Sequence, residues 1–167
     1  MYRRIDDFVK DWEHDAQTTL KVLRALTDES LAQRIVPEGR TLGRLAWHVT
    51  ETLPEMMEHA GLHGVTGPVP LSETPTSAAE IVAAYEGAAA SVGPAVTAGW
   101  TDDMLDEEVP MYGQQWKRGL VLSVLLLHQA HHRGQMTVLM RQAGLTVPGC
   151  YGPAAEEWAA MGIPAMA

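Results

Sequence analysis

Residues 116–143 read WKRGLVLSVLLLHQAHHRGQMTVLMRQA, a long and strongly apolar segment that carries three histidines within five positions. Its apolar residues recur at helical spacing, which predicts one long helix. Gly144 follows directly, and glycine is well suited to the left-handed position that commonly ends a helix. We therefore expect this segment to form the last main helix of the chain.

Three earlier segments also have the periodicity of helices. The first covers residues 5–26, where apolar residues recur at steps of three and four. The second begins after Thr41, a good N-terminal cap, and the third begins after Ser77, which forms a capping-box pattern with Glu80. Residues 61–76 are rich in glycine and proline and residues 99–115 are acidic, so both are expected to be long connections.

A short helix is expected near the C-terminus, where Pro153 opens the sequence PAAEEWAAMG. No segment shows the β-branched alternation that is typical of a strand. The expected fold is therefore all-α. It is a single domain over residues 1–167, built as a four-helix bundle with long crossover connections and a short C-terminal helix.

The composition excludes several classes of function. The chain has 167 residues, which suits one domain, and its 21 acidic and 12 basic side chains give a net charge of −9, the wrong sign for binding nucleic acid. A single cysteine forms no intramolecular disulfide and fits a reducing compartment. The sequence shows no signal peptide and no apolar run long enough to span a membrane. We expect a cytoplasmic protein that binds neither nucleic acid nor membranes.

The histidines of the last helix have the spacing of metal ligands. His128 and His132 are four residues apart, so their imidazoles project from one helix face and can bind one ion. His131, at the i+3 position, could replace either of them or could be a pocket residue. His48 lies near the apolar stripe of the second helix and is the candidate third ligand. Gln129 occupies the position of the glutamate in the HExxH motif, which disfavours a metalloprotease.

Four further residues are close in sequence to these histidines. Glu51 and Gln135 each lie one helical turn beyond a candidate ligand and could orient an imidazole or a bound water molecule. For Glu51 the alternative is a solvated helix residue. Trp47 could line a pocket beside the site. Arg133 is expected to be an exposed surface residue, because its position turns it away from the direction of its histidine neighbour.

The motifs LGRLAWHVTE and HQAHHRGQM, followed by VPGCYGP and an EEW-containing tail, resemble the DinB-like (DinB/YfiT) superfamily of bacterial metalloproteins. The resemblance covers essentially the whole chain. Its most specific part is an H-x₃-H pair followed by RGQ, which is matched here by residues 128–135. It implies a four-helix bundle, commonly a homodimer, that holds a divalent metal ion on His48, His128 and His132. The family pattern thus favours His132 over His131.

The resemblance also implies the kind of chemistry to expect. Characterised members include thiol-S-transferases that use bacillithiol, mycothiol or glutathione, a mycothiol-dependent maleylpyruvate isomerase, and proteins proposed to be metal-dependent hydrolases. We therefore expect a metal-dependent enzyme of the thiol-S-transferase or hydrolase type that acts on a small-molecule substrate. It would use a divalent ion, with zinc ahead of nickel, iron or manganese, and, if it is a transferase, a low-molecular-weight thiol. The alternative is a catalytically silent bundle that binds a metal ion or small ligand in a sensing or stress-related role.

Overall fold

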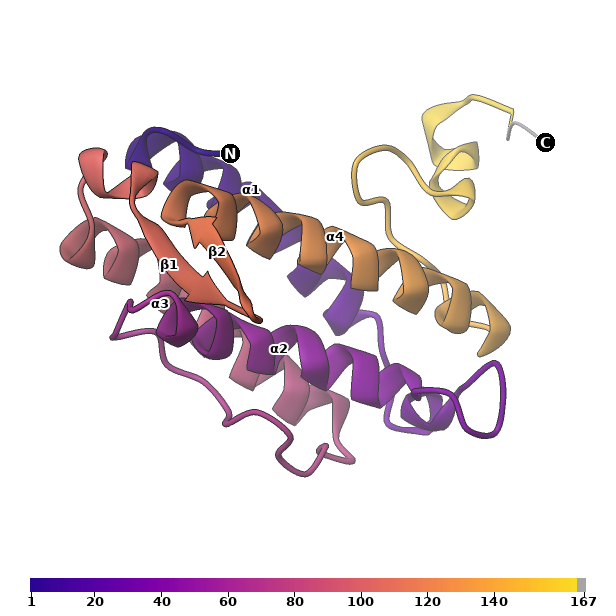
Figure 1. Cartoon of the computed structure of the whole chain (residues 1–167). Helices are drawn as coiled ribbons and strands as arrows, with labels where there is room; N and C mark the ends of the chain where they lie inside the picture. The colour runs from indigo at the N-terminus through magenta and orange to yellow at the C-terminus, as the bar shows by residue number, and fades with distance from the viewer. Residues whose placement is uncertain (165–167) are drawn as a thin grey trace.

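Four long helices form the body of the computed structural model, which describes residues 1–164 (Figure 1). The helices are α1 (Ile5–Arg24), α2 (Leu42–His59), α3 (Ala78–Gly99) and α4 (Arg118–Gln142). Helix α1 packs mainly on α3 and α4, and α2 packs on the same two helices, so α1 and α2 lie diagonally across the bundle. The predicted four-helix bundle is confirmed, and its first and last connections cross between diagonal helices.

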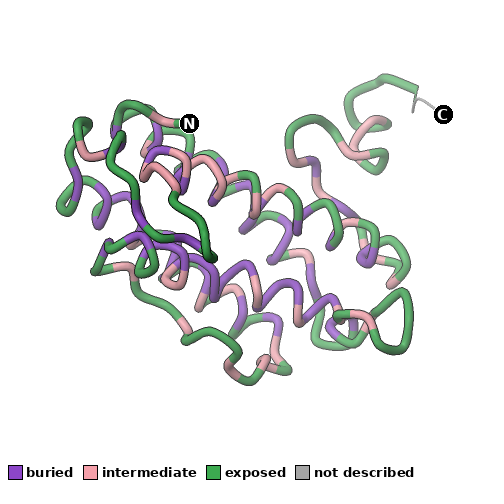
Figure 2. Tube along the Cα trace, viewed as in Figure 1, coloured by how far each residue is buried: buried purple, intermediate pink, exposed green. Residues whose placement is uncertain are grey.

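The core lies between the inner faces of the four helices, which are buried while the outer faces are exposed (Figure 2). Phe8 and Trp12 of α1 stack with their ring centroids 6.2 Å apart. The indole nitrogen of Trp12 donates a hydrogen bond to the carbonyl of Ala89 in α3 at 3.0 Å. This bond satisfies the polar atom of a buried aromatic side chain, which would otherwise cost free energy.

The helix ends follow the capping residues of the sequence. The hydroxyl of Thr41 accepts a hydrogen bond from the backbone nitrogen of Arg44 at 3.0 Å, and Ser77 caps α3 in the same way. Gly144 has a φ of 75°, and the backbone nitrogen of Leu145 donates to the carbonyl of Met140 at 2.9 Å. This pattern is the Schellman ending of a helix, which the glycine makes possible.

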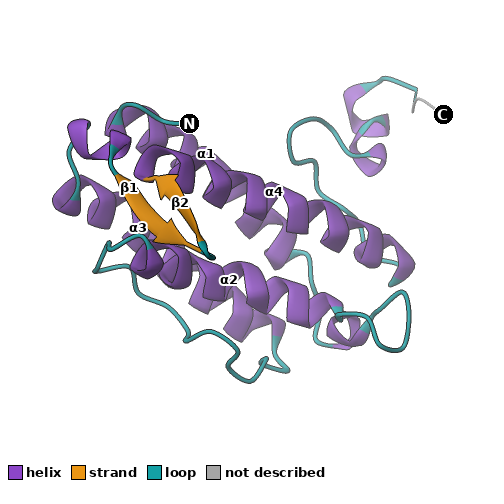
Figure 3. Ribbon diagram, in the orientation of Figure 1, coloured by secondary structure: helices purple, strands orange, loops and turns teal. Residues whose placement is uncertain are grey.

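A small antiparallel hairpin precedes α4, in a region where no strand was expected (Figure 3). Its strands are β1 (Glu108–Met111) and β2 (Gln114–Lys117). Tyr112 and Gly113 form the turn with φ values of 50° and 80°, as a two-residue hairpin turn requires. The strands are short and poor in β-branched residues, and the inward side chains Val109 and Met111 are buried in the protein core. Tertiary packing thus stabilises the hairpin. Because β2 includes Trp116 and Lys117, α4 begins at Arg118 rather than at Trp116 as predicted.

The C-terminal segment also differs from the prediction. Instead of one short helix, it contains two 3₁₀ turns, Ala155–Glu157 and Ala159–Met161, and residues 165–167 of the predicted domain lie outside the described part. The carboxylate of Glu157 accepts hydrogen bonds from the backbone nitrogens of Gly149 and Ala154, both at 3.0 Å. These bonds draw the chain into tight turns, and no residue of either turn is buried against the bundle.

Within residues 1–164, no helix has both the length and the apolar character of a membrane span.

Candidate metal centre

Three imidazoles from two neighbouring helices meet between α2 and α4. His48 extends from α2, and His128 and His132 extend from successive turns of α4. One ring nitrogen from each residue lies within 4.8 Å of the corresponding atoms of the other two. The ring centroid of His48 is 5.1 Å from that of His128 and 4.7 Å from that of His132. The structure therefore gathers the three predicted ligands into one cluster.

The separation of the ring nitrogens suits a shared divalent ion. The Nε2 atoms of His128 and His132 are 3.1 Å apart. Two imidazole nitrogens bound at about 2.0–2.1 Å to one tetrahedral zinc ion are about 3.3 Å apart. No fourth histidine, cysteine or carboxylate within residues 1–164 joins the cluster. The residues present thus fit a three-histidine site with further coordination positions available to a ligand.

Gln135 orients one of the imidazoles. Its side-chain oxygen lies 2.7 Å from Nδ1 of His132. Because a carbonyl oxygen only accepts hydrogen bonds, the proton of the imidazole sits on Nδ1, and Nε2 keeps its lone pair for the cluster. Nδ1 of His128 is buried and has no hydrogen-bond partner among the described residues. The orientation of His132 is that of a ligand with a supporting hydrogen bond.

The surroundings keep the imidazoles neutral. Burial, together with the charge that a protonated His132 would add, lowers the pKa of both His48 and His128 to about 4. Burial also lowers the pKa of His132, although its bond to Gln135 acts in the opposite direction. The positive charge of Arg40 contributes to the lowering at all three residues. Near neutral pH the cluster therefore offers lone pairs rather than protons.

Gln129 ties together the two helices that carry the cluster. It is fully buried, and its side-chain nitrogen donates to the carbonyl of Val49, next to His48, at 2.9 Å. Its side-chain oxygen accepts a hydrogen bond from the hydroxyl of Tyr85 at 3.2 Å. The sequence drew attention to Gln129 only as a departure from HExxH. The sequence signal that could have indicated this contact between helices is the position of Gln129 on the inward side of α4.

Two pockets flank the cluster. The pocket beside His132, here named the His132 pocket, has a volume of about 810 Å³ and lies between α4 and residues 35–40. The pocket beside His48 and His128, here named the His48 pocket, has a volume of about 780 Å³ and extends to Tyr112 of the hairpin. Arg40 lines both pockets. Both volumes lie within the range of small-molecule sites, so ligands can approach the cluster from two sides.

The sequence matches the family model described as the DinB family over residues 1–166, which is almost its whole length. The chain belongs to the DinB family. It is 47% identical over 165 residues to the uncharacterized protein YrdA of Bacillus subtilis (strain 168), a match that covers 99% of this chain and 98% of that protein.

Solved structures of DinB-like proteins have the same fold. A DinB-like protein from Bacillus cereus ATCC 10987 is 42% identical, with a TM-score of 0.86, and the match covers 90% of this chain and all of that one. The DinB-like protein YjoA from Bacillus subtilis is 18% identical, with a TM-score of 0.64 and coverages of 86% and 96%. The first relative supports family membership, whereas the second shows a shared fold alone.

In this DinB-family chain, Glu51 is a pocket residue beside the cluster, and Trp47 bonds to the connection between α2 and α3. Glu51 is buried rather than solvated, and its carboxylate bonds to the guanidinium of Arg44 and the hydroxyl of Ser72 rather than to an imidazole. The indole nitrogen of Trp47 donates to the same hydroxyl at 2.9 Å. These bonds hold the connection between α2 and α3 against α2, where Glu51 forms part of the wall of the His48 pocket.

His131 lies outside the cluster. Its side chain is exposed and lines the His132 pocket, with its ring centroid 4.9 Å from that of His132. The two positions differ by about 100° around the helix axis, which is enough to turn His131 away from α2. It therefore occupies the pocket position that was considered for it, and His132 is the residue that meets His48.

Arg133 is buried, so the expectation of an exposed surface arginine was wrong. Its side chain is 2% exposed and forms an ion pair with Asp15 of α1. One guanidinium nitrogen also donates to the hydroxyl of Thr19 at 2.6 Å, and the other donates to the hydroxyl of Tyr151 at 2.6 Å. Arg133 points away from the histidines, as expected, but this direction leads into the contact with α1. Asp15, which interrupts an apolar stripe, was the sequence signal that could have indicated a buried partner.

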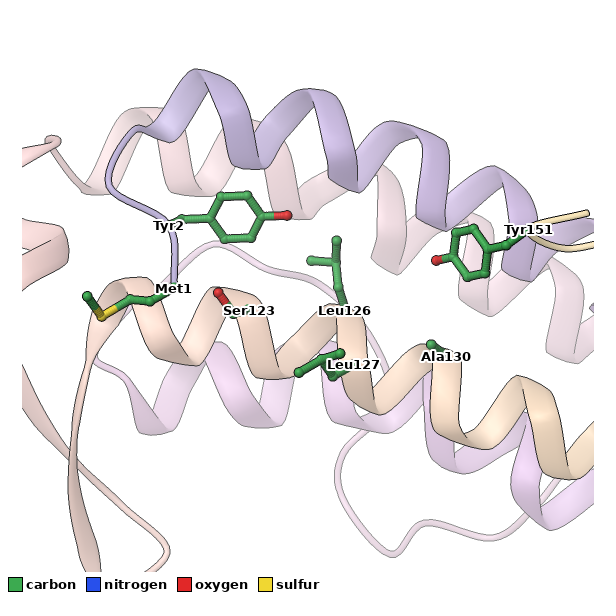
Figure 4. A pocket seen from close by; sticks show the side chains of 7 residues that line it. All are labelled: Met1, Tyr2, Ser123, Leu126, Leu127, Ala130 and Tyr151. Carbon is green, nitrogen blue, oxygen red and sulfur yellow. The ribbon is translucent and has the colours of Figure 1, made fainter.

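A separate groove lies between α1 and α4, lined by Tyr2 and Tyr151 and by Ser123, Leu126 and Leu127 of α4 (Figure 4). The two tyrosines stand at opposite ends of the groove in this view. The Tyr2 hydroxyl donates to Asp11 at 2.8 Å, and burial raises the pKa of Tyr2 well above its usual value. Within residues 1–164, the lining of this groove includes no histidine, cysteine or carboxylate, so we place the candidate site at the imidazole cluster instead.

The lowered pKa values predict how the metal-free protein responds to acid. An unfolded histidine has a pKa of about 6.5, whereas His48 and His128 have values of about 4 in the folded chain. Between these pH values the unfolded chain binds more protons than the folded chain. The free energy of unfolding therefore falls as the pH drops from about 6.5 towards about 4. An NMR titration of the metal-free protein should show both imidazoles titrating near pH 4, with His48→Ala used to assign the signals. Values above about 6 for both residues would contradict the prediction.

Proposed function

We propose that this DinB-family protein is a divalent-metal-dependent enzyme of the transferase type, which activates a small thiol at His48, His128 and His132. The observation that carries the proposal is the meeting of three imidazoles, with ligand atoms within 4.8 Å of one another, at the boundary between two pockets. Zinc is the preferred ion, and nickel, iron and manganese are the alternatives, because imidazole ligands accept several first-row metals.

The chemistry follows from an incomplete coordination shell. A divalent ion held by three neutral imidazoles would lower the pKa of a thiol or water molecule at an open position. The residues of the chain would prepare this position in different ways. The three histidines would hold the ion, Gln135 would keep the proton of His132 on Nδ1, and Gln129 would keep α2 and α4 in register. A silent structural site would instead be expected to have a fourth protein ligand.

The two pockets favour transfer over hydrolysis. A thiol transferase must place two organic reactants beside the ion, whereas hydrolysis needs one organic reactant and water. The His132 pocket and the His48 pocket have similar volumes, about 810 and 780 Å³, and each has at least one cluster histidine in its wall. This arrangement supports a thiol in one pocket and a second small molecule in the other. A homodimer and a cytoplasmic location are further predictions of the family resemblance and of the sequence.

Thiol binding can be tested with cobalt in place of the native ion. Protein purified without a histidine tag is loaded with Co²⁺ and titrated separately with glutathione, bacillithiol and mycothiol. We expect one of these thiols to produce a saturable sulfur-to-cobalt charge-transfer band, and His48→Ala to show no band. If the wild type binds cobalt but gives no band with any of the three thiols, the thiol-transferase proposal fails and the hydrolase or silent-binding alternative is preferred.

A further inference from the structure

Arg40 is an available guanidinium beside the cluster. It precedes the N-cap residue Thr41 of α2, is exposed, and lines both the His132 pocket and the His48 pocket. Among residues 1–164 it has no hydrogen-bond or ion-pair partner, whereas Arg44 in the His48 pocket is paired with buried Glu51. Arginine presents a planar fork of donors that matches the two oxygens of a carboxylate. Arg40 is therefore free to bind an anionic group on a ligand.

The charges of the two pockets differ. The His48 pocket includes the Arg44–Glu51 pair and a second carboxylate, Glu55, which accepts a hydrogen bond from Tyr112 at 2.8 Å. Among the described residues that line the His132 pocket, Arg40 is the single formally charged one, and none is a carboxylate. An anion in the His132 pocket would thus meet a positive group without a competing negative one, although the protein as a whole carries a net charge of −9.

Apolar side chains form the wall of the same pocket. Ile35, Val36 and Val138 are 67%, 51% and 49% exposed, and all three line the His132 pocket. Large aliphatic side chains gathered at a cavity gain free energy when a ligand covers them. The pocket thus combines one cationic group, an apolar wall and, at His132, an edge of the cluster.

We propose that the His132 pocket binds an organic anion, with the carboxylate held by Arg40 and an apolar part against Ile35, Val36 and Val138. The inference names a substrate class for the proposed enzyme and in that sense rests on the proposed function. The binding itself depends on Arg40 and on the apolar wall, so it does not require a bound metal ion. A small amphipathic monocarboxylate is the simplest molecule with both features.

Hexanoate and its neutral analogue hexanamide provide the test. Their affinities are measured by NMR titration of the full chain in two forms, one depleted of metal and one incubated with Zn²⁺. Hexanoate should bind the wild type about tenfold more tightly than hexanamide in both forms, because the carboxylate gains charge-assisted hydrogen bonds. Acetate should bind more weakly than hexanoate, because it is too short to cover the apolar wall.

Variants of basic residues separate a specific contact from a general effect of charge. Arg40→Gln should remove the preference for hexanoate over hexanamide, and Arg40→Lys should retain part of it. Lys10→Gln is the matched control, because it removes one positive charge from an exposed position of α1 outside both pockets and should leave the preference unchanged. Because Arg40 is exposed, its variants should keep the unfolding temperature of the wild type, which a thermal scan checks.

Three results would overturn the inference: equal affinity for hexanoate and hexanamide in the wild type, a preference that survives in Arg40→Gln, or hexanoate binding that requires Zn²⁺ and is insensitive to Arg40. The last result would make the carboxylate a metal ligand. If the preference depends on Arg40 in the metal-depleted protein while no metal binds at all, the anion site stands and the metalloenzyme proposal fails. The two proposals are thereby tested separately.

Discussion

Replacing His48 or His132 with alanine is expected to reduce the metal content of the protein from about one equivalent per chain to less than about a tenth. Either change leaves two imidazoles, and two nitrogen ligands hold a divalent ion much more weakly than three. In His48→Ala the remaining ligands are His128 and His132 of α4, whose Nε2 atoms are 3.1 Å apart, and in His132→Ala they are His48 of α2 and His128 of α4. Elemental analysis after purification without a histidine tag, and after reconstitution with Zn²⁺, measures the loss.

His131→Ala is the matched control for this experiment. His131 is adjacent to His132 in the chain but is exposed and lies outside the cluster, so its replacement should leave the metal content unchanged. Gln135→Leu should have an intermediate effect, weakening the affinity by about 10–100-fold, because it removes the hydrogen bond that orients His132. Retention of the metal in both His48→Ala and His132→Ala would refute the site. Loss of the metal in His131→Ala would indicate that His131, rather than His132, is the metal ligand.

The second large effect is expected from the ion pair in the core. Asp15→Ala should lower the free energy of unfolding by about 3–5 kcal/mol, because it leaves the guanidinium of Arg133 buried without a counter-charge. Both side chains are 2% exposed, and their two closest contacts are 2.6 and 2.8 Å. Tyr151 bonds to the same pair, so the change should also loosen the C-terminal segment. Urea denaturation measures the change in the free energy of unfolding.

An exposed ion pair between two helices serves as the control. Arg24 of α1 and Glu86 of α3 form a contact of 3.1 Å, with both side chains at least half exposed. Glu86→Ala should cost less than about 1 kcal/mol, because water screens such a pair. The double variant Asp15→Leu, Arg133→Met should recover much of the stability lost in Asp15→Ala, since it leaves no buried charge. A loss below about 1 kcal/mol for Asp15→Ala would contradict the role assigned to this pair.

The helices could be predicted because their signals are local. Thr41, Ser77 and Gly144 mark helix ends through hydrogen bonds to residues a few positions away, and the structure uses all three. The hairpin before α4 was missed because its strands carry little local preference and depend on burial of Val109 and Met111. The C-terminal helix was predicted as one element, whereas the structure has two short 3₁₀ helices there, because hydrogen bonds to Glu157 shape that segment.

Some features of the candidate site could likewise be predicted from local sequence patterns, whereas others depend on tertiary contacts. A histidine pair at i and i+4 on an apolar helix, the resemblance to the DinB family and the position of a third histidine could all be read in the sequence. The partners of Glu51 and Arg133 could not be read there, because Ser72 and Asp15 are distant in the chain, 118 residues away in the second case. Arg40 likewise carries no sequence signal for its place between two pockets.

The four helices, the ends marked by Thr41, Ser77 and Gly144, the family and the candidate ligands could therefore be predicted from the sequence alone, whereas the start of α4 at Arg118 could not. These depend on apolar periodicity, on capping bonds within a turn and on the fixed rotation between residues of a helix. The burial of Arg133 against Asp15 and the two pockets at the cluster are known from the tertiary structure alone, which also places His132, the histidine that the family pattern favoured over His131, beside His48. The physical reason is that these features depend on which faces of the helices pack together, and that packing joins residues far apart in the chain.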